Sequence, residues 1–189
     1  MSTADTPRRL HTPLEGTGHT PWDPLRKIEA PLRLHQTLVR DEWVDYNQHM
    51  SESCYLLVFG DNSDAFFRYI GVDEDYRDRG GHSFYTVETH LHNLREAALG
   101  APLHLELQLL DLDPKRMHIF HAMRHGESGE LLATGEQMLV HVDMKQGRAA
   151  PMPDDLFARL QVIQAAHAPL PRPTQAGSSI GIRRRATSS

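Results

Sequence analysis

Apolar and polar residues follow different periods along this chain, and the changes of period divide it into segments. Between residues 32 and 40 the two kinds alternate, which predicts a strand. Between residues 49 and 70 the apolar positions fall on one stripe of a 3.6-residue period, which predicts a helix of about six turns ending at Gly71. The stripe consists of Tyr55, Val58, Phe59, Phe66, Tyr69 and Ile70.

Gly60 lies in the middle of this predicted helix, where glycine costs about 1 kcal/mol relative to alanine. Such a residue is expected where another element packs closely against the helix backbone. We therefore expect a sheet that wraps tightly around the helix at this point.

Four extended segments follow a polar, glycine-containing loop at residues 73–81. They run over residues 82–94, 103–111, 116–125 and 131–142, and short turns rich in glycine, proline and aspartate separate them. Consecutive long strands joined by short turns form an antiparallel sheet. The order of one strand, one long helix and four strands predicts an α+β fold in which one sheet covers one helix.

The two ends of the chain show no comparable period, apart from a short apolar stripe over residues 154–167 that predicts a second helix. We therefore expect three regions. They are a flexible N-terminal arm over residues 1–30, one α+β domain over residues 31–150, and a C-terminal short helix with a disordered tail over residues 151–189.

The composition excludes several classes of partner. The chain is 39% hydrophobic and 24% charged, and no apolar run approaches the roughly 20 residues that span a bilayer. The N-terminus lacks a secretory signal pattern, so we expect a cytoplasmic protein. The net charge is −5 although residues 168–189 hold four arginines and no acidic residue, so the body of the protein is acidic. An acidic body argues against nucleic acid, and the cluster at residues 183–185 is interpreted as a solvated tail.

The single cysteine, Cys54, limits the possible sulfur chemistry. One thiol allows neither an intramolecular disulfide nor a thiolate-rich metal site within the chain. Cys54 falls inside the helical segment, where we expect it to be a core residue and not a nucleophile.

Candidate chemistry is concentrated at Asp45, Asn47 and His49, just before the long helix. The unpaired N–H groups and the dipole of a helix N-terminus favour negative charge there. A carboxylate at such a position is suited to hydrolysing an activated acyl group, with Asp45 as the base and helix amides stabilising the oxyanion. The alternative is structural, because a lone aspartate at this point can also be a cap or turn residue.

The run Asp45-Tyr46-Asn47-Gln48-His49-Met50, continued by Ser51, resembles the Asp-x-Asn-Gly-His-Met-Asn motif of the hotdog-fold thioesterases. The resemblance covers roughly residues 32–144, and it departs from the motif at Gln48, usually Gly, and at Ser51, usually Asn. It implies a curved antiparallel sheet around a central helix and no metal or organic cofactor.

By the same resemblance Asp45 would activate water or attack the thioester itself, and the backbone amides of His49 and Met50 would form the oxyanion hole. Asn47 and His49 would orient the reacting groups. Glu88 is a second candidate carboxylate, contributed across a dimer interface, and the alternative is that it meets solvent or an ion-pair partner.

Residues 84–96 and 151–153 further resemble the short thioesterases of carnitine and betaine breakdown, which implies betainyl-CoA as the substrate. Aromatic faces bind a quaternary ammonium by cation–π contact, worth about 2 kcal/mol when it is desolvated. The aromatic residues closest to the motif in sequence are Trp43, Tyr46, Phe84 and Tyr85, which we take as substrate-binding candidates.

Other functions compete with this interpretation. His90, His92 and Glu96 match the His-x-His-x-x-x-Glu core of a cupin metal site, but Phe84 stands where that motif has glycine. Hydratases of the hotdog fold place the histidine five residues after the aspartate, whereas His49 is four after Asp45. A general short-chain or aromatic acyl-CoA thioesterase, or a hotdog protein that binds acyl-CoA without turnover, also remains open.

The expected partners are an acyl-CoA substrate and further copies of the chain. An open sheet leaves an edge strand to be paired, and the family commonly joins such edges, so we expect a homodimer or a dimer of dimers. The phosphates of CoA need cations. Arg95, Lys115, Arg116 and Arg148 are available for them, and the sequence does not distinguish among these four.

Overall fold

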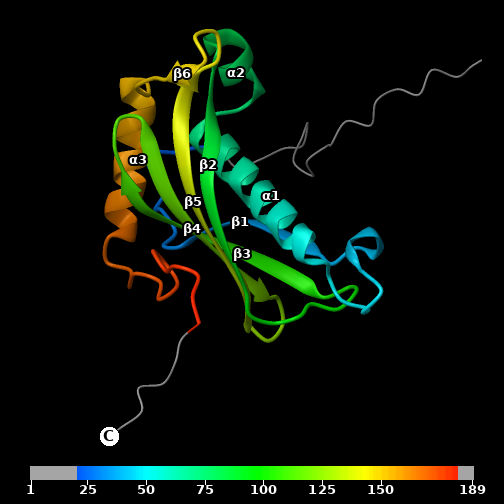
Figure 1. Cartoon of the computed structure of the whole chain (residues 1–189). Helices are drawn as coiled ribbons and strands as arrows, with labels where there is room; N and C mark the ends of the chain where they lie inside the picture. Colours follow the sequence, from blue (N-terminus) through cyan, green and yellow to red (C-terminus); the bar gives the residue numbers. More distant parts are fainter. Residues whose placement is uncertain (1–20, 183–189) are drawn as a thin grey trace, which may run out of the picture.

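The computed structural model describes residues 21–182, which form one antiparallel sheet with its helices (Figure 1). The sheet has the order β1-β3-β4-β5-β2, and β6 pairs with β5. The strands are β1 (Leu32–Leu38), β2 (His82–Asn93), β3 (Pro102–Leu112), β4 (Arg116–His125), β5 (Leu131–Asp143) and β6 (Arg148–Ala149). The helices are η1 (Asp41–Trp43), a 3-10 helix, then α1 (Glu52–Ile70), α2 (Glu74–Gly80) and α3 (Asp154–His167).

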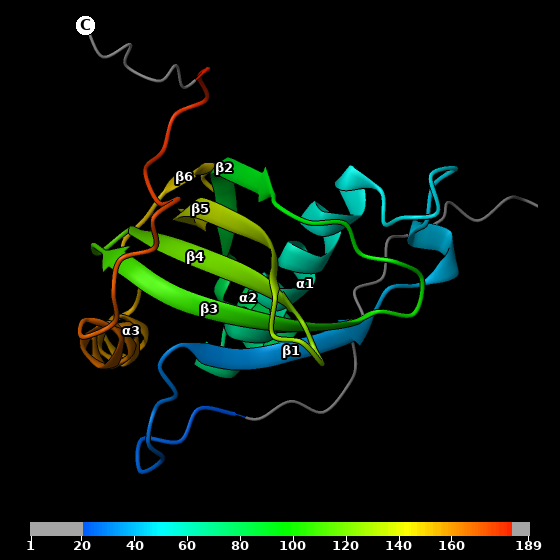
Figure 2. The ribbon, with the colours of Figure 1, turned by 90° about the horizontal axis from the view of Figure 1, so that it is seen from below.

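The predicted α+β fold is confirmed, and the sheet curves around α1 (Figure 2). Two details of the prediction are wrong. The long helix begins at Glu52 and not at residue 49, because residues 49–51 form backbone bonds with other segments. The predicted loop at residues 73–81 contains α2, which buries none of its side chains and so has no apolar stripe in the sequence.

α1 joins two hydrophobic clusters of the core. Its first half packs with residues that include Trp43 and Ala97, and its second half packs with residues that include Phe84 and Leu160 of α3. At the end of α1, Arg159 of α3 donates a hydrogen bond to the carbonyl of Ile70. None of the helices in the described residues is long and apolar enough to span a bilayer.

Close packing between helix and sheet occurs at Gly135 of β5, not at Gly60. A Cβ atom at Gly135 would lie 2.9 Å from the Phe59 ring, so this glycine lets the ring approach the strand. A Cβ atom at Gly60 would have no neighbour within 4 Å, and Gly60 is exposed. The expectation that Gly60 allows close packing was therefore wrong within this chain.

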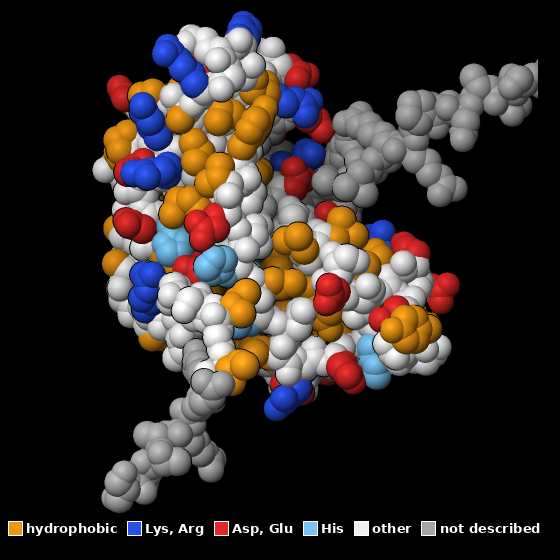
Figure 3. All heavy atoms as spheres, in the orientation of Figure 1, with side chains coloured by type: hydrophobic (Ala, Val, Ile, Leu, Met, Phe, Trp, Pro, Cys, Tyr) orange, Lys and Arg blue, Asp and Glu red, His pale blue; other side chains and the backbone are white. Residues whose placement is uncertain are grey.

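β2 is an edge of the sheet and carries exposed apolar side chains. Tyr85 and Val87 are about half exposed or more, at 52% and 61%. On the face shown in Figure 3, hydrophobic side chains gather over β2 and beside α1.

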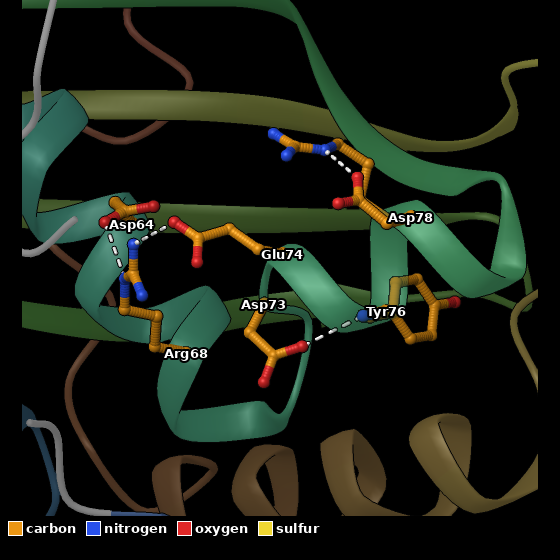
Figure 4. A network of polar contacts seen from close by, with 7 residues as sticks. Asp64, Arg68, Asp73, Glu74, Tyr76 and Asp78 are labelled. Carbon is orange, nitrogen blue, oxygen red and sulfur yellow. Dashed lines mark hydrogen bonds and ion pairs between the residues drawn. The ribbon is translucent and has the colours of Figure 1, made fainter. Parts of the chain in front are cut away.

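The junction between α1 and α2 is fixed by caps and ion pairs (Figure 4). Gly71, with φ 84°, ends α1 and donates to the carbonyl of Arg68 at 3.1 Å. Arg68 Nε donates to Asp64 Oδ2 at 3.0 Å, and its Nη2 lies 3.4 Å from Glu74 Oε1. Asp73 then caps α2 by accepting the N–H of Tyr76 at 2.9 Å.

A buried polar cluster lies between the middle of α1 and the sheet. Asn62 Nδ2 donates to His121 Nδ1 at 2.9 Å, and His121 Nε2 lies 3.1 Å from Gln137 Oε1. Ser63 Oγ also contacts Gln137 Oε1, at 3.0 Å. These bonds fit a neutral imidazole that accepts at Nδ1 and donates at Nε2. Burial lowers the pKa of His121 to about 4, opposed by the hydrogen bond to Gln137.

The segment after α3 lies against the sheet in its described part. Gly177 N–H donates to Glu136 Oε1 and Oε2 on β5, at 3.0 and 2.8 Å. Ser178 Oγ lies 3.1 Å from His92 Nε2 on β2. We call residues 168–182 the C-terminal strap. Gly177 and Ser178 hold this segment against the sheet, and the arginine cluster at residues 183–185 lies outside the described residues.

The N-terminal arm is described only from residue 21, and this part also contacts the core. The Trp22 ring packs edge-on against Tyr69 with centroids 5.7 Å apart. Ile28 packs against the cluster that contains Phe66. Residues 21–30 are thus part of the packed structure.

We predict that acidification destabilises the protein through His121. The folded state holds this imidazole neutral with a pKa near 4, whereas the unfolded pKa is about 6.5. The stabilisation is complete above about pH 6.5 and is lost as the pH falls toward 4. The unfolding free energy of the wild type should fall between pH 7.5 and pH 4.5. In the His121→Gln protein this fall should be smaller by roughly 2 kcal/mol, as measured by urea denaturation at both pH values.

Exposed His104 provides the matched control, because His104→Gln should leave the wild-type pH dependence unchanged. Equal acid sensitivity of the His121→Gln protein and the wild type would contradict the assignment of the neutral form to His121.

Candidate active site

Residues 43–51 form a closed loop that leads into α1. Asp45 N–H donates to the carbonyl of His49 at 3.0 Å, and Ser51 N–H donates to that of Trp43 at 2.8 Å. Gln48 N–H closes the tip by donating to the carbonyl of Asp45 at 3.0 Å. In this antiparallel pairing Asp45 lies opposite His49, which is two residues before Ser51, the N-cap of α1.

Gln48 has φ 67° and is the one non-glycine residue with positive φ in the described part of the chain. The left-handed region favours glycine because a Cβ atom crowds the backbone there. This geometry gives a physical reason for glycine at this position of the motif. It also means that glutamine, in place of the glycine of the motif, adopts the same loop conformation but lowers the stability of the fold.

Asp45 and Asn47 lie together in a local turn. Asp45 Oδ1 accepts the backbone N–H of Asn47 at 2.8 Å, and Asn47 Nδ2 lies 3.5 Å from Asp45 Oδ2. The turn role that was the structural alternative for Asp45 is therefore present. It orients the carboxylate, which is partly exposed, and does not exclude a reaction at Oδ2.

His49 points to a different partner. Its Nε2 lies 3.3 Å from Glu96 Oε2, in an exposed ion-pair position. The structure thus pairs His49 with the segment after β2, and His49 supports Asp45 through its backbone carbonyl.

The segment at residues 95–97 anchors the loop from the other side. Met50 N–H donates to the carbonyl of Ala97 at 2.8 Å, and Tyr55 Oη donates to the carbonyl of Arg95 at 3.2 Å. Met50 and Ala97 are buried. These bonds hold the start of α1 in one position relative to the loop.

The expected oxyanion donor Met50 requires a correction. Its N–H is already paired with Ala97, so it is not available to a substrate oxygen. The first turn of α1 offers other donors: the N–H groups of Glu52 and Ser53 have no partner among the described residues. Ser51 occupies the N-cap position but makes no side-chain capping bond.

The four aromatic candidates separate into two groups. Trp43 and Phe84 are core residues, 5% and 6% exposed, so they offer no face to a substrate in this chain. Phe84 stacks on Phe67, with ring centroids 5.7 Å apart, and belongs to the cluster around the second half of α1. Tyr46 is 91% exposed beside Asp45, and Tyr85 is exposed on β2, so both remain available.

Glu88 and the histidines of β2 do not converge on one point. Glu88 is exposed on the edge strand and pairs with His90 at 2.9 Å. His92 contacts Ser178, and Glu96 pairs with His49. The three residues of the cupin-like motif therefore have three separate partners, and Glu88 remains a candidate only.

Sequence reasoning missed Asp61 of α1, which is buried, and whose Oδ2 has no hydrogen-bond partner among the described residues. Burial raises its pKa to about 6, opposed by the charge of Arg40. The signal in the sequence was the polar run at residues 61–63 inside an otherwise apolar helix. Asn62 and Ser63 of that run form the buried cluster with His121.

Comparison with known proteins identifies the family. The model of the thioesterase-like superfamily matches residues 39–160, and the chain belongs to this superfamily. The resemblance to hotdog thioesterases is thereby confirmed.

Two curated relatives are similar over most of the chain. The L-carnitine dehydrogenase/betainyl-CoA thioesterase of Rhizobium meliloti is 48% identical over 163 residues, which are 85% of this chain and 33% of that protein. This chain therefore spans about a third of that relative's length. The betainyl-CoA thioesterase of Pseudomonas aeruginosa is 44% identical over 151 residues, which are 80% of this chain and 95% of that protein.

Solved structures agree with the fold. A putative thioesterase from Pseudomonas putida has a TM-score of 0.73 and 34% identity, over 82% of this chain and 99% of that one. A protein from Staphylococcus aureus in complex with CoA has a TM-score of 0.77 and 25% identity, over 84% of this chain and 100% of that one.

We predict that Gln48→Gly stabilises the protein. Glycine removes the cost of holding a non-glycine residue at positive φ, but it also gives the unfolded chain more conformational entropy. The net gain in unfolding free energy should be about 0.5 to 1 kcal/mol. Chemical denaturation measures it. Gln146→Gly, at an exposed turn without positive φ, is the matched control and should lose several tenths of a kcal/mol. Equal changes in the two proteins would contradict the role of φ at residue 48.

Proposed function

We propose that this chain hydrolyses an acyl-CoA thioester to the free acid and CoA, and that betainyl-CoA is its substrate. The observation that carries the proposal is the carboxylate of Asp45, held by Asn47 on a closed loop at the start of α1. The names of the relatives from Rhizobium meliloti and Pseudomonas aeruginosa support the substrate. The CoA complex of the Staphylococcus aureus protein supports CoA as the carrier.

In the proposed reaction Asp45 takes a proton from water as the water oxygen attacks the thioester carbonyl. Attack by the Asp45 carboxylate itself is the other route: it expels the CoA thiolate and forms a mixed anhydride, which water then hydrolyses to release the acid and restore Asp45. Both routes need the ionised side chain. The negative charge that develops on the carbonyl oxygen is stabilised by the N–H groups of Glu52 and Ser53 and by the helix dipole. The C–S bond then breaks, and the CoA thiolate leaves and is protonated.

The trimethylammonium group of betainyl-CoA needs aromatic or anionic surroundings. Tyr46 is the exposed ring next to Asp45 and is proposed to supply a cation–π contact. Tyr85 of β2 is the second candidate, because an edge strand can reach the site of a neighbouring copy.

We predict that Asp45→Asn lowers kcat/KM for betainyl-CoA by about 10²-fold or more, because the amide can neither accept the proton nor attack. CoA release is followed with a thiol reagent over a panel of betainyl-CoA, its uncharged carbon analogue 3,3-dimethylbutyryl-CoA, butyryl-CoA and benzoyl-CoA. Wild-type kcat/KM should be highest for betainyl-CoA.

Asp41→Asn is the matched control, since Asp41 is an exposed acid of η1 in the same segment, and it should retain wild-type activity. Equal rates on betainyl-CoA and its carbon analogue would contradict the substrate but not the hydrolysis. Binding of these thioesters without release of CoA would instead favour a non-catalytic acyl-CoA-binding protein.

The proposal includes a homodimer, or a dimer of dimers, in the cytoplasm. The free edge of β2 and its exposed Tyr85 and Val87 support an interface with a second copy (Figure 3). An edge of this length that stays unpaired favours aggregation, and pairing removes the risk.

We predict that Val87→Lys dissociates the dimer, because it places a charge in the apolar interface. Sedimentation velocity measures the change from dimer to monomer. Val162→Lys is the matched control, since Val162 of α3 is similarly exposed, at 53%. A monomeric wild type, or dissociation by Val162→Lys alone, would contradict an interface at β2.

A further inference from the structure

The C-terminal strap covers part of the outer face of the sheet, the face opposite α1. Leu105 and Leu107 of β3 point into the core, so Glu106 between them points outward. Phe120 of β4 and Thr134 of β5 share this outer face, yet they are only 5% and 1% exposed. The strap passes β4 and β5 on its way from α3, as Figure 2 shows.

A cavity of about 410 Å³ lies between the strap and this face. Its floor consists of outward side chains of β3, β4 and β5, and residues 170–175 of the strap form its other side. The volume is within the range of small-molecule sites, about 300 to 1,000 Å³. Phe120 and Leu170 are among the apolar residues that line it.

The charged groups of the cavity favour an anion. Glu106 is its one lining acid, and both of its oxygens are already paired: Oε1 with Arg33 and Oε2 with Arg124, each at 2.9 Å. Arg172 of the strap also lines the cavity. No carboxylate among the described residues lies within ion-pair distance of Arg172. A guanidinium in this position is free to bind a carboxylate.

Thr134 adds an unsatisfied polar group at the floor. Its side chain lines the cavity, and its buried Oγ1 has no hydrogen-bond partner among the described residues. A buried hydroxyl without a partner costs about 1 to 3 kcal/mol, so a polar ligand atom nearby would offset this loss.

We propose that this cavity binds a small carboxylate with an apolar body. The carboxylate pairs with Arg172, and the body packs on Leu131 and Leu170, the partly exposed leucines of the lining. The site differs from the proposed thioester site, because none of the residues that line it belongs to the loop at residues 43–51 or to α1. It needs no hydrolysis, so it does not depend on the proposed function.

Benzoate is the probe, and uncharged benzamide is its matched analogue. Isothermal titration of the full chain should show saturable benzoate binding at millimolar concentrations, and binding of benzamide at least tenfold weaker. Arg172→Leu should weaken benzoate binding at least tenfold. Arg172 is exposed, so this substitution leaves the core intact.

Arg79→Leu is the control for loss of a surface charge, since Arg79 lies on α2 and is also exposed. It should bind benzoate as the wild type does, and so should Asp45→Asn. Hydrogen exchange places the ligand: benzoate should slow exchange at strap residues 170–178 in the wild type but not in Arg172→Leu.

The absence of saturable benzoate binding would overturn the proposal, and so would equal affinity for benzamide or binding that survives Arg172→Leu. Loss of benzoate binding in Asp45→Asn would also overturn it, because it would place the anion at the thioester site. Failure of the hydrolysis assay has no bearing on any of these measurements.

Discussion

Burial of α1 in the curve of a single sheet is the contact on which the rest of the structure depends. Phe59, Phe66 and Ile70 of the helix are fully buried, and each contributes about 1.5 to 3 kcal/mol of transfer free energy. The absence of a side chain at Gly135 lets the Phe59 ring lie against β5. Because both halves of α1 are packed into core clusters, its first turn has a defined position, and the candidate site is built on that turn.

The site itself is mainly an arrangement of backbone. Asp45 is held by a loop whose ends are joined through Trp43 and Ser51, and a second segment fixes the loop through Ala97. Donors that are fixed before substrate arrives need no reorganisation during the reaction, which makes them effective in stabilising an oxyanion. This arrangement also explains why the turn role of Asp45 and a chemical role are compatible: the turn supplies the orientation that the chemistry needs.

The sequence predicted the strands and the helix that follow from local periodicity. It could not predict contacts between segments that are far apart in the chain. The strands and α1 were found because their apolar residues repeat at 2.0 or 3.6 positions. The start of α1 was placed three residues early, since the pairing of Met50 with Ala97 joins segments far apart in the chain. The same bond removed Met50 from the expected oxyanion donors. Trp43 and Phe84 were assigned to the substrate by proximity in sequence, whereas their burial follows from the tertiary fold.

Arg159 of α3 donates a hydrogen bond to the carbonyl of Ile70, the last residue of α1. The opposite end of α1 is joined to the loop before it. A helix of 19 residues is about 28 Å long and is stiff along its axis. Bonds at both ends therefore restrict movement of α1 along its own axis. The first-turn amides beside Asp45 belong to a helix whose other end is held by a residue of α3.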